Sequence, residues 1–172
     1  MKKNILITGV PGIGKTTIIV RLLEELKDFC VVGFYTKVIR QGGIRKGFEL
    51  MDPTGKKSIL SHVCIKSPVR VIKYGVDIQA FDEFLDAIAF FDPSTDVIII
   101  DEIGKMECLS QKFNALLEKI MESEKPLIAT IALKGTGIIK RVKERADVRL
   151  FELKRDNRES LVRDITVLID SW

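Results

Sequence analysis

The stretch that decides the fold is Gly9-Val10-Pro11-Gly12-Ile13-Gly14-Lys15-Thr16, which fits the pattern G-x-x-x-x-G-K-[ST]. Residues 3–8, just before it, are rich in β-branched side chains and stop at Gly9, as expected of a buried strand. After it, apolar residues recur at helical spacing: Ile18, Ile19, Leu22, Leu23 and Leu26. A glycine-rich loop between a strand and an amphipathic helix is the context that this pattern requires, so residues 9–16 are interpreted as a phosphate-binding loop, or P-loop.

The P-loop predicts how a nucleotide would bind. Its backbone N–H groups are expected to surround the β-phosphate, where the positive end of the following helix also attracts an anion. Lys15 is expected to bridge the β- and γ-phosphates, Thr16 to place its hydroxyl on Mg²⁺, and Thr17 to lie near the α-phosphate. The alternative, a solvated lysine at a helix start, is disfavoured because it would oppose the helix dipole. The predicted nucleotide-binding set from this loop is Gly9, Val10, Pro11, Gly12, Ile13, Gly14, Lys15, Thr16 and Thr17.

A second acidic element is expected to complete the site. Val97-Ile98-Ile99-Ile100 is apolar on both faces and is followed by Asp101 and Glu102, the pattern of a Walker B strand. Asp101 is expected to hold Mg²⁺, directly or through water, and Glu102 to face the γ-phosphate and orient an attacking water. The alternative is an acidic pair that only ends a strand.

The remaining sequence alternates strands and helices, which predicts a mostly parallel α/β sheet between two helical layers. A β-rich insert, with a hairpin turn at Gln41-Gly42-Gly43, interrupts this alternation. The other expected strands are residues 30–39, 45–51, 57–62, 96–101, 126–133 and 148–153. The other expected helices are residues 78–91, a helix containing Phe113 to Met121, and a terminal helix capped at Asp156-Asn157-Arg158-Glu159 with Leu161, Ile165, Leu168 and Trp172 on one face.

Composition limits the class of protein. The chain has 172 residues, of which 46% are hydrophobic, and its net charge is +4, so we expect one folded domain over residues 1–172. The longest apolar stretch, residues 87–91, is too short to span a bilayer or to form a signal peptide, so we expect a cytoplasmic protein with no membrane partner. Three widely spaced cysteines and a single histidine make a disulfide framework or a zinc site improbable.

Asp101-Glu102-Ile103-Gly104-Lys105-Met106-Glu107 resembles the DEIGKME signature of the THEP-type nucleoside-triphosphatases. Further matching stretches run through nearly the whole chain: residues 33–36, 43–48, 73–76 and 156–158. The resemblance implies a RecA-like sheet with an extra strand between the P-loop strand and the Walker B strand. It also implies slow, broadly specific, Mg²⁺-dependent hydrolysis of nucleoside triphosphates to diphosphates. Two positions depart from the family pattern: Val38 and Asp82 stand where relatives tend to carry Glu, and Val38 removes a carboxylate that would anchor Arg40.

Several further residues are candidates with open alternatives. Lys105 could reach the γ-phosphate, as the resemblance favours, or form a surface pair with Glu107. Asn157 and Arg158 are expected at a helix start near the carboxyl edge of the sheet, where they would contact the base or ribose. An arginine finger acting within the chain would come from the basic stretch, with a solvated helix face as the alternative for each candidate: Arg141, Arg145 and Arg149.

Three functions remain in competition. The first is hydrolysis of ATP, GTP and other nucleoside triphosphates by a monomer. The second is a nucleotide-gated RNA- or protein-binding module, because residues 134–158 carry nine basic and four acidic residues, a net charge of +5. The third is a small-molecule or nucleotide kinase, which would need an acceptor pocket in the insert at residues 34–66. We rank hydrolysis first because Glu102 directly follows Asp101.

Overall fold

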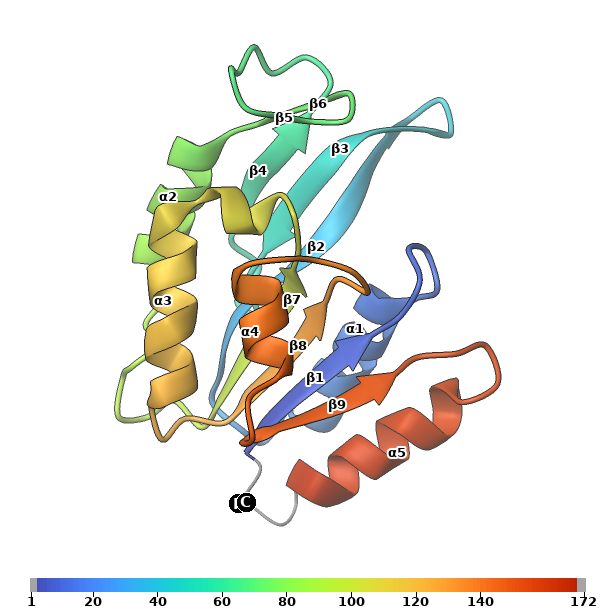
Figure 1. Ribbon diagram of the computed structural model, residues 1–172, viewed down its shortest axis with the longest axis vertical. Coiled ribbons are helices and arrows are strands. Elements are labelled where there is room, and N and C mark those ends of the chain that lie inside the picture. Colours follow the sequence, from blue (N-terminus) through green and yellow to red (C-terminus); the bar gives the residue numbers. More distant parts are fainter. Residues whose placement is uncertain (1–2, 170–172) are drawn as a thin grey trace.

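A computed structural model describes residues 3–169, and all its strands belong to one sheet in the order β5-β6-β4-β3-β2-β7-β8-β1-β9 (Figure 1). The strands are β1 (Asn4–Thr8), β2 (Val31–Gln41), β3 (Ile44–Met51), β4 (Lys57–His62), β5 (Arg70–Val71), β6 (Tyr74–Val76), β7 (Val97–Ile103), β8 (Leu127–Ile131) and β9 (Val148–Glu152). The helices are α1 (Lys15–Glu25), α2 (Ile78–Asp86), α3 (Gln111–Glu122), α4 (Ile138–Lys143) and α5 (Arg158–Ile169), with a 3₁₀ turn at Glu107–Leu109.

The half of the sheet that carries the P-loop is parallel. Strands β2, β7, β8, β1 and β9 pair side by side in the same direction. Strand β8 lies between β1, which leads into the P-loop, and β7, which carries Asp101. This is the extra strand of a RecA-like sheet, and the expected fold class is confirmed.

Alternation along the parallel strands builds two hydrophobic cores, one on each face of the sheet. Leu6 of β1 belongs to the core covered by α2, α3 and α4, whereas its neighbours Ile5 and Ile7 belong to the core covered by α1 and α5 (Figure 1). Successive side chains of a strand point to opposite faces, so an apolar strand is buried on both sides only when helices cover both faces. The molecule therefore has three layers.

The other half of the sheet is the β-rich insert, which is antiparallel. The predicted turn between β2 and β3 is present, with Gly42 at φ 56° and Gly43 at φ 77°, a region that glycine adopts without steric cost. Strands β4, β6 and β5 continue the insert outward. The sequence did not predict β5 or β6, because strands of two and three residues are too short to show an alternating pattern.

Three helix predictions need correction or completion. The helix expected over residues 78–91 ends at Asp86, and Phe90 is buried from a turn rather than from a helix face. The basic stretch after β8 contains the short helix α4, which sequence periodicity did not reveal. The terminal helix begins at Arg158 and buries Leu161 and Ile165 as expected, whereas Trp172 lies outside the described residues.

No helix within residues 3–169 combines the length and the apolar character needed to cross a membrane.

Candidate active site

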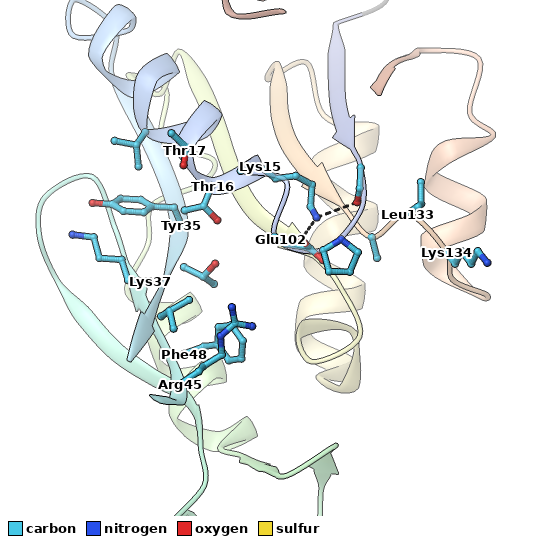
Figure 2. A pocket seen from close by; sticks show the side chains of 18 residues that line it. Lys15, Thr16, Thr17, Tyr35, Lys37, Arg45, Phe48, Glu102, Leu133 and Lys134 are labelled. Atoms are coloured by element: carbon cyan, nitrogen blue, oxygen red, sulfur yellow. Dashed lines mark hydrogen bonds and ion pairs between the residues drawn. The ribbon is translucent and has the colours of Figure 1, made fainter. Parts of the chain in front are cut away.

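A cavity of about 990 Å³ opens at the carboxyl ends of β1, β7 and β8 and beside the middle of β2, and Figure 2 shows the side chains that line it. In parallel α/β sheets ligands bind at this edge, because the loops that follow the strands converge there. Its lining comes from the P-loop and α1, from the β2–β3 hairpin, from the end of β7 and from the turn after β8: Gly9, Pro11, Gly12, Gly14, Lys15, Thr16, Thr17, Val20, Tyr35, Thr36, Lys37, Val38, Arg45, Phe48, Glu102, Ala132, Leu133 and Lys134.

The predicted P-loop occupies one wall of this cavity. Gly14 has φ 108° and is the N-cap of α1, so Lys15 is the first residue of the helix. The Lys15 ammonium lies 3.3 Å from the Gly9 carbonyl oxygen and 3.3 Å from Glu102 Oε2. The loop therefore holds a nearly buried cation beside the carboxylate that follows the Walker B strand, as Figure 2 shows.

Asp101 is the centre of a buried hydrogen-bond cluster. Its Oδ2 accepts hydrogen bonds from Thr16 Oγ1 at 2.7 Å, from Thr36 Oγ1 at 3.0 Å and from the Thr36 backbone N–H at 3.2 Å. Its Oδ1 accepts one from the Thr130 hydroxyl. Asp101 is only 1% exposed, yet no lysine or arginine within residues 3–169 forms an ion pair with it. A buried carboxylate surrounded by hydroxyls and lacking a cationic side chain offers the hard oxygen ligands that Mg²⁺ prefers.

Glu102 faces the cavity next to Lys15. Burial raises the pKa of Glu102, and the nearby Lys15 ammonium opposes that rise. A partly desolvated carboxylate with a raised pKa is a better proton acceptor than an ordinary surface glutamate. The position and environment of Glu102 thus suit a group that accepts a proton from water.

Lys105 and Glu107, the two other charged residues of this segment, lie in different environments. Lys105 is exposed, does not line the cavity and forms no ion pair with Glu107 within the described chain. Glu107 is buried, and desolvation raises its pKa to about 8. The surface Lys–Glu pair considered from the sequence is therefore wrong, and the γ-phosphate role of Lys105 stays a prediction.

Neither Asn157 nor Arg158 lines the cavity, although Arg158 contacts the P-loop. The Asn157 side chain accepts a hydrogen bond from the Lys154 N–H and donates one to the Glu152 carbonyl, so it stabilises the turn into α5. Arg158 donates from Nη2 to the carbonyl oxygen of Ile13, in the middle of the P-loop. Both side chains support loops in this structure, and their expected contact with the base or ribose stays a prediction.

The structure does not bring Arg141, Arg145 or Arg149 to the cavity lining. Arg141 pairs with Glu118 of α3, and Arg145 pairs with Asp147, which lies just before β9 at the amino edge of the sheet. Arg149 lies over the Phe151 ring on β9. The expectation that this stretch delivers arginines to the carboxyl edge overlooked α4, which runs back toward the amino edge before Arg145 is reached.

Other cations near the cavity were missed. Lys37 and Arg45 line it from the β2–β3 hairpin, and Lys134 lines it from the turn after β8. Lys143 donates from Nζ to the carbonyls of Ala132 and Leu133, at 2.6 and 2.8 Å, and so holds that turn. Burial lowers the pKa of Lys143, while the Glu102 carboxylate opposes this shift. The only sequence signal was the match of residues 43–48 to the family pattern, which did not indicate where Arg45 points.

The RecA-like strand order, the P-loop with its helix and the Lys15–Glu102–Asp101 grouping place the protein in the class of P-loop nucleoside-triphosphatases. A family model described as NTPase matches residues 4–166. The nucleoside-triphosphatase THEP1 of Thermotoga sp. (strain RQ2) is 43% identical over 163 residues, which cover 94% of this chain and 92% of that relative. The cancer-related nucleoside-triphosphatase of Homo sapiens is 34% identical, covering 99% and 98% of the two chains.

Solved structures agree with these sequence matches. The crystal structure of THEP1 from the hyperthermophile Aquifex aeolicus superimposes with a TM-score of 0.84 at 35% identity, over 97% of this chain and 99% of that one. The solution structure of the human cancer-related nucleoside triphosphatase gives 0.81 at 34% identity, over 98% and 97%. The chain belongs to the THEP1-type nucleoside-triphosphatase family.

Proposed function

We propose that this chain is a Mg²⁺-dependent hydrolase that converts nucleoside triphosphates, ATP and GTP among them, to diphosphates and phosphate. The observation that carries the proposal is the convergence of four side chains: Lys15 lies 3.3 Å from Glu102, and Thr16 donates a hydrogen bond to Asp101 at 2.7 Å. The family name of its relatives, nucleoside-triphosphatase, supports the same activity. Nothing in this arrangement requires a second polypeptide, so we propose that the single domain acts as a monomer.

Mg²⁺ fits the donor set around Asp101. Thr16 and Asp101 would hold the ion, and when bound it would neutralise charge on the β- and γ-phosphate oxygens. The two side chains already share a hydrogen bond, and within residues 3–169 no lysine or arginine pairs with the Asp101 carboxylate. Lys15 would move its ammonium from the Gly9 carbonyl and Glu102 to the phosphates.

Glu102 is proposed to orient the attacking water and accept its proton. Its carboxylate lies on the cavity surface beside Lys15, and its pKa is raised by burial. When a triphosphate draws the Lys15 ammonium away, Glu102 loses its ion-pair partner and becomes a stronger base. Turnover is expected to be slow, below the median of about 10 s⁻¹ for enzymes, as the resemblance to the THEP1-type family implies.

The basic stretch gives less support to the nucleic-acid alternative than its charge suggests. Four of its nine cations form ion pairs with nearby carboxylates: Lys140, Arg141, Arg145 and Lys154. Paired cations contribute less to phosphate binding than free ones, because the anion must first displace their partners. Hydrolysis therefore remains the first candidate.

Free phosphate release tests the proposal. Purified protein would be assayed with each of the four ribonucleoside triphosphates, with Mg²⁺ or with EDTA, and with no acceptor other than water. We expect phosphate and diphosphate in equal amounts with Mg²⁺ and none with EDTA. Nucleotide binding without phosphate release would instead favour the kinase or the nucleotide-gated module, and transfer of the γ-phosphate to an added nucleoside monophosphate would single out the kinase.

A further inference from the structure

The β2–β3 hairpin forms the cavity wall opposite the P-loop. Its contribution is the set Tyr35, Thr36, Lys37, Val38, Arg45 and Phe48, which we call the hairpin wall. Figure 2 shows Arg45 and Phe48 across the cavity from Lys15 and Glu102. The wall is thus part of the same cavity as the proposed catalytic groups, although it comes from the insert rather than from the parallel core.

The hairpin wall lies on the side of the cavity where the terminal phosphate is expected. Thr36 donates two hydrogen bonds to Asp101 Oδ2, the same oxygen that accepts from Thr16. In P-loop proteins the P-loop threonine and the Walker B carboxylate hold the metal that bridges the β- and γ-phosphates. Since Thr36 is joined to this pair, we expect the residues that follow it on the hairpin to face the γ-phosphate end of a bound triphosphate.

Arg45 is exposed, and its guanidinium lies over an aromatic ring. Its Cζ lies 5.5 Å from the centre of the Phe48 ring, and that ring packs edge-on against Tyr74 at 5.4 Å. Within residues 3–169 no carboxylate or carbonyl group is its partner in a hydrogen bond or ion pair. A guanidinium carries five N–H donors in one plane, suited to the oxygens of a phosphoryl group. Arg141 and Arg145, by contrast, have carboxylate partners.

Charge balance in the cavity points the same way. Its lining holds four cations, Lys15, Lys37, Arg45 and Lys134, and one carboxylate, Glu102, which is paired with Lys15. The positive charge that no carboxylate of the cavity lining balances is therefore carried by Lys37, Arg45 and Lys134, which lie outside the P-loop. Such charge is most useful where negative charge accumulates during the reaction.

We propose that Arg45 is a catalytic residue that acts within its own chain as the arginine finger of this site. This inference rests on the proposed hydrolysis. As the water oxygen bonds to the γ-phosphorus, the bond from that phosphorus to the β–γ bridging oxygen breaks. The electron pair leaves with the diphosphate, and the proton of the water passes to Glu102. Arg45 binds the γ-phosphoryl oxygens most strongly at this stage, when the phosphoryl group lies between the attacking water oxygen and the departing diphosphate.

The test compares Arg45→Ala and Arg45→Gln with a control on the same hairpin. Arg40→Ala is the control, because Arg40 donates to the Gly43 carbonyl at 2.9 Å and does not line the cavity. Removing Arg45 should lower kcat by roughly 10²-fold or more while KM and the Kd for ATP change less than about threefold, as for a contact made only in the transition state. Arg40→Ala should keep wild-type kcat.

The glutamine variant keeps a long polar side chain over Phe48, so it separates loss of charge from loss of packing. If both Arg45 variants retain wild-type kcat, or raise KM with kcat unchanged, Arg45 is not the finger. If the wild-type chain itself releases no phosphate, the proposed function fails instead, so the two failures are distinguishable. A loss of kcat in both variants with intact nucleotide binding supports the proposal.

Discussion

At the scale of single residues, Glu107 is a buried carboxyl group whose pKa is shifted far from its ordinary value. Burial raises its pKa from 4.5 to about 8, with the nearby Glu102 and Asp101 carboxylates adding to the rise. Gly104 leaves room for it, because a Cβ there would lie 2.9 Å from Glu107 Oε2. The cost of this burial is small while the carboxyl group is protonated and grows as it ionises.

Glu107→Gln should therefore change how stability depends on pH. A folded-state pKa above the unfolded value gives a contribution that is complete below pH 4.5 and is lost as the pH rises toward 8. Between pH 5 and pH 8 the variant should gain at least about 1 kcal/mol in free energy of unfolding relative to wild type. Urea unfolding at both pH values, without Mg²⁺ or nucleotide, measures this. The exposed Glu124→Gln serves as control, and parallel pH curves for wild type and Glu107→Gln would show that Glu107 is ionised throughout.

At the scale of elements, α5 helps to shape the P-loop through Arg158. Its guanidinium donates to the Ile13 carbonyl and lies 3.6 Å from the position that a Cβ on Gly14 would occupy. A P-loop binds phosphate through backbone N–H groups, so the orientation of each peptide unit matters. Arg158 thus has a role that the sequence did not suggest, because the expectation was a contact with the nucleotide itself.

Arg158→Ala should raise KM by roughly 3–30-fold for all four triphosphates alike, since one charge-assisted hydrogen bond to the loop is lost. Phosphate-release kinetics with each nucleotide checks this, with Arg163→Ala on the exposed face of α5 as the control. A loss confined to one base would instead support the contact with base or ribose.

The junction of β2 and β7 depends on a glycine. Gly33 has φ 122°, and a Cβ there would lie 1.8 Å from the Ile99 carbonyl oxygen of the neighbouring strand. Any side chain would push β2 away from β7, and with it Thr36 away from Asp101. The approach of the two backbones is what positions the hairpin wall.

Gly33→Ala should cost about 3 kcal/mol or more in free energy of unfolding, or leave the protein insoluble. Gly55→Ala is the matched control, because Gly55 also has positive φ, 93°, but faces open space, and it should cost only about 1–2 kcal/mol. Denaturant unfolding compares the two. Equal losses would mean that the close approach of β2 to β7 is not what Gly33 protects.

At the scale of the whole molecule, the sequence predicted the parts that obey strong periodic patterns. The P-loop, the apolar strand before Asp101 and the parallel sheet all follow from local pattern and from the order of motifs along the chain. The far wall of the cavity was not predictable in this way. Arg45 is 30 residues from Lys15 in sequence, and only the pairing of β2 with both β3 and β7 brings it to the P-loop. Arg145 was wrongly expected at the carboxyl edge of the sheet for a similar reason. Its position depends on the direction of α4, which local sequence patterns did not reveal.

A site completed within one chain predicts first-order dependence on protein concentration. Turnover per chain should stay constant over about a hundredfold range of protein concentration at saturating ATP, because no second copy supplies a group. Phosphate release across that range measures it, with size-exclusion chromatography reporting the state of the protein. Turnover that rises with concentration would show that another copy contributes to the site.

The central claim, that this cavity hydrolyses triphosphates with Glu102 as the proton acceptor, is tested most directly by Glu102→Gln. The variant keeps the shape of the side chain but loses its basicity, so the Kd for ATP with Mg²⁺ should change little while single-turnover hydrolysis slows by roughly 10²–10⁴-fold. Measuring both quantities on the same preparation separates binding from chemistry. A variant that binds ATP and hydrolyses it at the wild-type rate would contradict the account.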